Sequence, residues 1–221
     1  MAEGETFELA RAASSTDEPI DGGAKRRQVM DGARAVFMKD GFDGASMNDI
    51  ARAAGVSKGT LYAYFESKER LFEALIREDK AQQAERLCNF SGLRDDPAEF
   101  LTQYGRRLVE MLIRPEHIAQ VRTVIACCGK FPNLGRAFYE SGPCFGAKRL
   151  AAEIEAFVQS GALIIDDCLA AAQQFLDMSH GSMVKPVLFG ASSGPTADEI
   201  DKSVARAVMV FMAAYGAKRR G

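Results

Sequence analysis

Apolar residues recur along most of the chain at the spacing of a single helix face, and glycines, prolines and capping residues separate the segments. In the first segment Val29, Ala33 and Phe37 stand at i, i+4 and i+8, and Gly41 is the predicted stop. Residues 1–23 offer few apolar anchors, so we expect a mobile N-terminal arm there. Folded structure is expected to begin directly after this arm.

Two short helices are predicted between residues 46 and 65. Ser46 with an Asp three residues later matches the capping-box pattern, and Gly55 closes the helix that follows. Ser57 is placed to cap a helix of only about seven residues that reaches Phe65. Leu61 and Phe65 stand four apart, so they should share its buried face.

The remainder of the chain is also predicted to be helical, in longer segments. Caps and helix breakers place these segments at about 67–90, 96–114, 116–132, 143–160, 168–189 and 197–215. Gly142-Pro143 is expected to interrupt the helical structure, and Pro186 is expected to kink the helix that contains it. With no strand pattern and no repeat, the predicted class is all-α. Helix length changes near residue 67, which predicts one domain at 24–66 and a second at 67–221.

Composition limits the functional classes only weakly. The 221 residues are 47% apolar, enough for an ordinary core, and the formal net charge is −2, so any nucleic-acid contact must come from local clustering. The N-terminal region lacks the basic start and apolar run of a secretory signal, and no apolar stretch reaches about 18 residues. Five cysteines without framework spacing fit a reducing compartment. We therefore expect a cytoplasmic protein with no membrane contact.

The segment 45–72 has the outline of a helix-turn-helix, in which the second helix lies in the major groove of DNA. The groove is about 12 Å wide, so the entering helix needs a slim leading end, which Gly59 and Thr60 supply. Hydroxyl groups at helix starts bind phosphate oxygens, and Ser46, Ser57 and Thr60 are candidates for this contact.

Positive charge and tyrosines surround this candidate recognition helix. Residues 24–68 hold eight Lys or Arg against five Asp or Glu, a local net charge of +3 that the acidic remainder hides. A tyrosine ring can stack on a sugar or a thymine methyl group while its hydroxyl donates to a phosphate. The predicted contacts of this kind are Lys25, Arg26, Arg27, Lys58, Tyr62, Tyr64 and Lys68.

Helical hairpins with Gly, Ser and Lys in the turn are common, so the pattern alone leaves open whether this one binds DNA. The continuous stretch SMNDIARAAGVSKGTLYAYFESKERLF, however, resembles the N-terminal DNA-binding domain of the tetracycline repressor (TetR) family. That family reads D-I-A-x-x-A-G-V, then S-x-G-T-x-Y-x-Y/H-F, then S-K-E-x-L-F. The resemblance covers about residues 24–72. It implies a homodimeric, ligand-controlled repressor in which these positions usually meet DNA: Ser46, Lys58, Gly59, Thr60, Tyr62, Tyr64 and Lys68.

A second resemblance, to the ligand-binding domain of the AefR-like TetR subgroup, rests on FPNLGRAFYESGP, RLAAEIEAFVQSGAL and DDCLAAAQQFLDM. A small hydrophobic effector would occupy a cavity between the helices of this half. The candidate lining residues are Tyr104, Leu108, Met111, Val124, Phe138, Phe145, Phe175 and Met178. For each of them ordinary core packing remains the alternative. Bound effector is expected to tilt the helix at 67–90 that links the two halves.

The helices at about 168–189 and 197–215 combine apolar stripes with small residues, which predicts a four-helix dimer interface. A two-fold dimer would place two recognition helices on a palindromic operator. Cys127-Cys128 raises the alternative of a redox-sensing repressor of the same fold. Adjacent cysteines on a helix point about 100° apart, so neither a metal nor another cofactor is predicted. No nucleophile elbow accompanies the two histidines, so an enzyme is not expected, and a helical protein that ignores DNA is the more distant alternative.

Overall fold

A computed structural model describes residues 22–88 and 96–217, so the predicted arm at 1–23 lies almost wholly outside the described residues. Within these ranges the fold is all-α, as predicted, and Leu163 and Gly216 form one isolated bridge. The helices are α1 (Gly22–Gly44), α2 (Met47–Ala53), α3 (Lys58–Tyr64), α4 (Lys68–Cys88), α5 (Pro97–Leu112), α6 (Pro115–Cys128), α7 (Pro132–Tyr139), the π-helical turn η1 (Glu140–Cys144), α8 (Phe145–Gln159), α9 (Cys168–Leu188) and α10 (Ala197–Tyr215).

The predicted local signals act where they were expected. Ser46 Oγ accepts from the Asp49 amide at 3.2 Å, and Ser57 Oγ accepts from the Thr60 amide at 3.0 Å. Thr196 and Glu199 form a complete capping box at the start of α10. The predicted stop at residue 41 is a break inside α1, where φ is 69° before helix resumes to Gly44.

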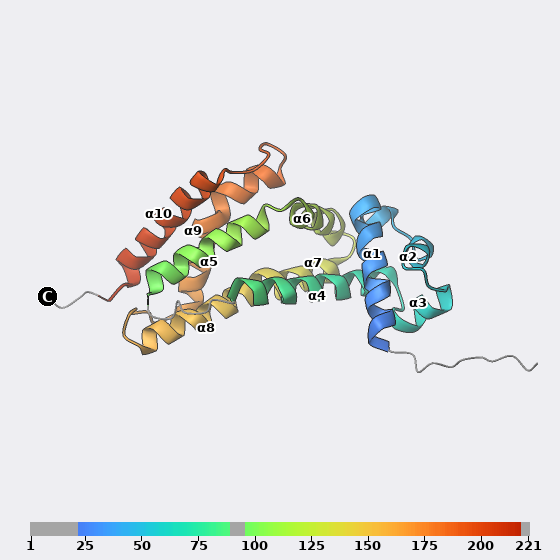
Figure 1. Cartoon of the computed structure of the whole chain (residues 1–221), viewed down its shortest axis with the longest axis horizontal. Helices are drawn as coiled ribbons and strands as arrows, with labels where there is room; N and C mark the ends of the chain where they lie inside the picture. The colour runs from blue at the N-terminus through green and yellow to red at the C-terminus, as the bar shows by residue number, and fades with distance from the viewer. Residues whose placement is uncertain (1–21, 89–95, 218–221) are drawn as a thin grey trace, which may run out of the picture.

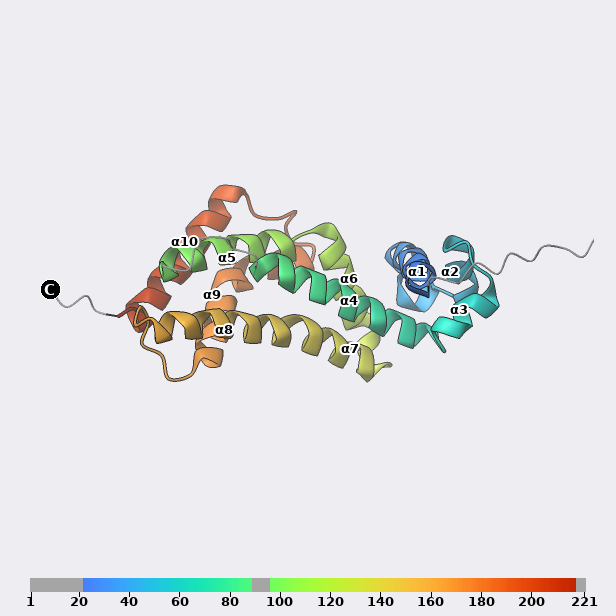
Figure 2. The same ribbon diagram turned by 60° about the horizontal axis from the view of Figure 1, so that its bottom comes forward.

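The molecule is elongated, with α1–α3 at one end and α10 toward the other (Figure 1). The long helix α4 starts among α1–α3 and runs alongside α7, η1 and α8 in both views (Figures 1 and 2). Two buried apolar clusters divide the interior. The first joins α1–α4 with Val124, Cys127 and Leu134, and the second joins α5, α8, α9 and α10 with Leu87 of α4.

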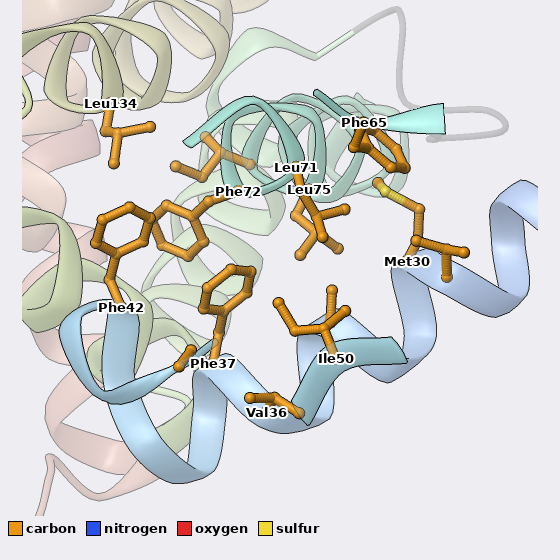
Figure 3. Close-up of a cluster of buried hydrophobic side chains, with 14 of the residues drawn as sticks. Met30, Val36, Phe37, Phe42, Ile50, Phe65, Leu71, Phe72, Leu75 and Leu134 are labelled. Atoms are coloured by element: carbon orange, nitrogen blue, oxygen red, sulfur yellow. The ribbon is translucent and has the colours of Figure 1, made fainter. Parts of the chain in front are cut away.

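The first cluster fixes the short helices onto α4. Phe37 and Phe42 of α1 meet Phe72 of α4 with ring centres 4.8 Å and 5.2 Å from it (Figure 3). Leu134 of α7 lies beside them, so the core continues past α4. Helix α4 contributes to both clusters, so the packing alone does not mark where one domain ends. The division into domains at 24–66 and 67–221 stays a prediction.

The predicted interruption at Gly142-Pro143 is wrong. Helix α7, the turn η1 and helix α8 follow one another without a gap, so one helical path runs from residue 132 to 159. In a π-helical turn each bond spans five residues, and the wider turn accommodates the ring and missing amide of Pro143. Helix α9 continues past Pro186 to Leu188, and the kink expected at Pro186 stays a prediction.

Candidate nucleic-acid interface and ligand cavity

The turn between α2 and α3 is built on Gly55. Its φ is 62°, a left-handed conformation that glycine adopts without strain. The Gly55 amide donates to Arg52 O at 3.1 Å and the Val56 amide to Ala51 O at 3.0 Å, which together satisfy the end of α2. Gln28 Nε2 adds a 2.7 Å bond to the carbonyl of residue 54. The turn is thus fixed from both sides.

A glycine that the sequence pattern does not single out sets the distance between α1 and α2. A Cβ at Gly32 would lie 2.5 Å from the backbone nitrogen of Ala54, far inside van der Waals contact. Gly32 itself is buried. Only a residue without a side chain permits this approach, and α1 therefore supports α2 through direct backbone packing.

Helix α3 buries one face and presents the other. Leu61 and Phe65 are buried as predicted, while Lys58, Gly59 and Tyr62 are exposed, the last with 51% of its surface accessible. A Cβ at Gly59 would have only Ser57 Oγ within 4 Å, at 3.7 Å. Nothing inside the protein requires glycine there, which agrees with an external reason for it.

The basic residues that are predicted to contact DNA fall into two groups. Lys25, Arg27 and Lys58 are exposed and free to face a negatively charged partner. Arg26 is turned toward α4, where it pairs with Glu78 at 3.2 Å. The Lys68 ammonium donates to the carbonyl of Phe42, in the last turn of α1, at 2.6 Å and to that of Ala45, in the α1–α2 connection, at 2.9 Å. Arg26 and Lys68 thus hold the domain together in this structure.

The remaining polar candidates are partly engaged within the domain. Ser46 is half-buried and holds the side chain of Asp49, a contact that lowers the pKa of that carboxyl. Thr60 Oγ1 lies 2.8 Å from Ser57 Oγ. Tyr64 packs against the first cluster. The exposed face available to DNA is therefore formed mainly by Lys58, Gly59 and Tyr62 on α3 and by the start of α1.

A cavity of about 490 Å³ lies between α4, α5, α6, α7, η1, α8 and α9. Four predicted residues line it, namely Tyr104, Leu108, Met111 and Phe138. The other four do not, because helix rotation turns them elsewhere. Val124 packs in the first cluster and Phe175 in the second, whereas Phe145 and Met178 are exposed.

The sequence reasoning missed the polar part of this cavity, which centres on Lys80. Its ammonium lies 3.2 Å from Gln83 Oε1 and 3.2 Å from His117 Nδ1. Burial, and second the charge of Lys80, lower the pKa of His117 to about 3, so this imidazole is neutral. A signal was present: Lys80 follows Ile76 by four residues and thus continues the apolar stripe of α4.

The cysteine pair is only partly accessible. Burial, with Cys128 as the second cause, raises the pKa of the Cys127 thiol, which disfavours the reactive thiolate. Each thiol donates to a carbonyl three residues earlier, Val124 O for Cys127 and Ile125 O for Cys128. Among residues 22–88 and 96–217, no group of three potential metal ligands comes together. In the same part of the chain, no helix has the length and apolarity to cross a membrane.

A short exposed helix, supported by two others and joined through α4 to a helical domain with a ligand-sized cavity, defines a helix-turn-helix DNA-binding regulator. Comparison with known proteins makes this specific. Residues 29–75 match the family described as bacterial regulatory proteins of the tetR family, and residues 99–217 match the AefR-like transcriptional repressor C-terminal domain. The chain belongs to the TetR family of transcriptional regulators, which are non-enzymatic.

Several relatives agree with this assignment. A TetR-family regulator structure from Mesorhizobium loti is 29% identical, with a TM-score of 0.83 over 89% of this chain and 98% of that one. The flavonoid-responsive regulator FrrA is 35% identical, with a TM-score of 0.77 over 90% and 100%. The repressor AcnR of Corynebacterium efficiens is 33% identical over 90 residues, 38% of this chain and 46% of that repressor. The match thus spans less than half of this curated relative.

Proposed function

We propose that this protein is a repressor that binds a palindromic operator as a homodimer and releases it when a small, mostly apolar effector fills the cavity. The observation that carries the proposal is the double role of α4. Its first half forms the core under α2 and α3, and its second half forms a wall of the cavity. A ligand that shifts α4 would therefore move the core on which the recognition helix α3 is packed.

Two neighbouring residues of α4 support this coupling. Asp79 pairs with Arg34 of α1 at 2.7 Å, and the next residue, Lys80, faces the cavity. Gln120 of α6 also reaches Asp79, at 3.4 Å. A movement of α4 at the cavity would be transmitted to α1 through this ion pair and through the first cluster, in which Phe37 of α1 meets Phe72 of α4. The effector must bind the two positions of α4 with different affinity to shift the equilibrium.

The effector class proposed is a small aromatic molecule. The cavity volume lies in the range of about 300–1,000 Å³ that is usual for small-molecule sites. Aromatic side chains, Tyr104 and Phe138, lie on its wall. The relative FrrA, named for its response to flavonoids, matches 90% of this chain and supports the same choice.

Dimerisation is proposed through α9 and α10. Met209 and Val210 of α10 are 64% and 49% exposed, and Leu169 and Met178 of α9 are also accessible. Large apolar side chains exposed on two neighbouring long helices are the kind of surface that a partner subunit would cover. If Val210→Glu leaves the protein a dimer in light-scattering measurements, the interface lies elsewhere.

The function is tested by fluorescence anisotropy with labelled DNA from the region upstream of its own reading frame. We expect Tyr62→Ala to weaken binding without unfolding the protein, because Tyr62 is exposed. A flavonoid such as naringenin should release the wild-type protein from the DNA. Unchanged operator affinity across a panel of small aromatic compounds would rule out regulation by release.

A further inference from the structure

Lys80 is an unusual residue for a cavity wall because it is a buried cation whose direct contacts are neutral groups. Only 3% of its surface is exposed. Its ammonium contacts Gln83 and the neutral His117, and it lies 4.4 Å from the ring centre of Phe138. Burial lowers the pKa of Lys80 to about 8, so the side chain still carries its charge at neutral pH.

Among the side chains that the structure describes, no carboxylate comes within 4.0 Å of this ammonium. The adjacent Asp79 is already engaged by Arg34 and Gln120. A buried charge without a counter-ion is costly, and protein interiors normally pair it or leave it neutral. None of the described carboxylates pairs with Lys80, and an anion in the cavity would supply that missing negative charge.

The segment that packs against the Lys80 side chain leaves room for it. The π-helical turn Glu140–Cys144 places Gly142 against the lysine stem, where a Cβ would lie 3.2 Å from Lys80 Cδ. Such turns are rare and occur frequently at functional sites. The glycine and the wide turn together keep room for an extended lysine in a wall that is otherwise helical.

The other cavity residues give the orientation of a ligand. Leu108, Met111 and Phe138 offer apolar surface for the body of the molecule. Helix α9 contributes Asp177 and His180 to the lining. Burial lowers the pKa of His180, which disfavours its cationic form, and Asp177 would repel an anion. A negative group is therefore favoured at the α4 side only.

We propose that the effector is an amphipathic acid, an aromatic body with one ionised carboxylate or phenolate oxygen, and that Lys80 binds this oxygen. This inference rests on the proposed role of the cavity as the effector site. It adds the charge of the ligand and the residue that recognises it. Gln83 and His117 hold the ammonium in place when the cavity is empty and orient it toward the ligand.

The test uses two fluorescent dyes that share one ring system. Anilinonaphthalene sulfonate carries an anionic group, and N-phenyl-1-naphthylamine lacks it. Both are titrated into the full-length wild-type protein, into Lys80→Met, and into Lys148→Met as the matched control, because Lys148 is exposed on α8. We expect Lys80→Met to weaken sulfonate binding at least tenfold and to leave the neutral dye unchanged. Lys148→Met should match the wild type.

Equal affinity of the sulfonate dye for the wild type and for Lys80→Met would overturn the inference that Lys80 binds the anionic group. Binding of the neutral dye in the same experiment would still support the cavity as the effector site. If neither dye binds the wild type, the cavity proposal itself fails and this inference with it. Lys80→Gln replaces the Met variant if the latter does not fold. Displacement of the sulfonate dye by cinnamate but not by methyl cinnamate, or by naringenin but not by its methyl ether, would add support and distinguish carboxylate from phenolate. Equal displacement by acid and methylated forms would contradict the proposal.

Discussion

Replacing Lys80 by Met should change how the stability of the ligand-free protein depends on pH. Burial lowers the pKa of Lys80 from 10.5 to about 8, and the nearby Asp79 charge opposes this only in part. A difference of this size corresponds to about 3 kcal/mol of unfolding free energy. The cost is fully present below pH 8 and disappears above the pKa of the unfolded chain.

The sign follows from proton binding. Between the two pKa values the unfolded chain keeps a proton that the folded protein has released, so a rise in pH favours the folded state of the wild type. Lys80→Met lacks this contribution. We therefore expect the stability of the wild type to rise relative to that of the variant by up to about 3 kcal/mol between pH 7 and pH 11. His117, with a pKa of about 3, does not titrate in this window.

The assay is urea unfolding followed by circular dichroism at several pH values for both proteins. All other titratable groups are common to both chains, so their contributions cancel in the difference. Lys148→Met serves as the control and should show no such pH-dependent gap, since Lys148 is exposed. A constant difference between wild type and Lys80→Met from pH 7 to pH 11 would show that Lys80 is solvated, and the reasoning would fail.

Three further predictions concern the DNA-binding half and the cysteines. Gly32→Ala should destabilise the protein by several kcal/mol in urea unfolding, because its Cβ would lie 2.5 Å from the backbone nitrogen of Ala54 at the end of α2. Gly59→Ala should leave the stability equal or raise it by up to about 1 kcal/mol, and it should still weaken operator binding. Equal losses of stability in the two variants would refute this distinction. Lys58→Ala should weaken operator binding and lower its salt dependence by about one counter-ion per subunit in anisotropy titrations, and an unchanged slope would exclude a phosphate contact. The double variant Cys127→Ser, Cys128→Ser should still be released from the operator by the effector. If the wild type responds to an oxidant and this variant does not, the redox alternative gains support.

Much of the helix-turn-helix could be predicted from the sequence because its determinants are local. The caps at Ser46 and Ser57 act over three residues, and Gly55 closes α2 through bonds to the preceding turn. The resemblance of the helix-turn-helix to a known family rests on the same short stretch of sequence. The close approach at Gly32 was missed because it joins two helices through space, and nothing in the surrounding pattern marks it.

The cavity was much less predictable. Tyr104 and Phe175 both belong to apolar stripes, yet only the former lines the cavity, because the rotation of each helix decides which side of a stripe meets a neighbour. Lys80 resembles a solvated residue when it is considered alone. Its place in the stripe of α4 becomes meaningful only where the turn at Gly142 packs against it.

The sequence by itself determined the helices, their caps and the exposed face of α3, since each depends on contacts within a few residues. Tertiary structure alone decided that Gly142-Pro143 is absorbed in a π-helical turn, that Lys68 holds the α1–α2 connection, and that Lys80 is buried beside the cavity. These outcomes depend on how helices from distant parts of the chain pack together, and a single sequence shows at most one side of such a contact, as the place of Lys80 in the stripe of α4 does.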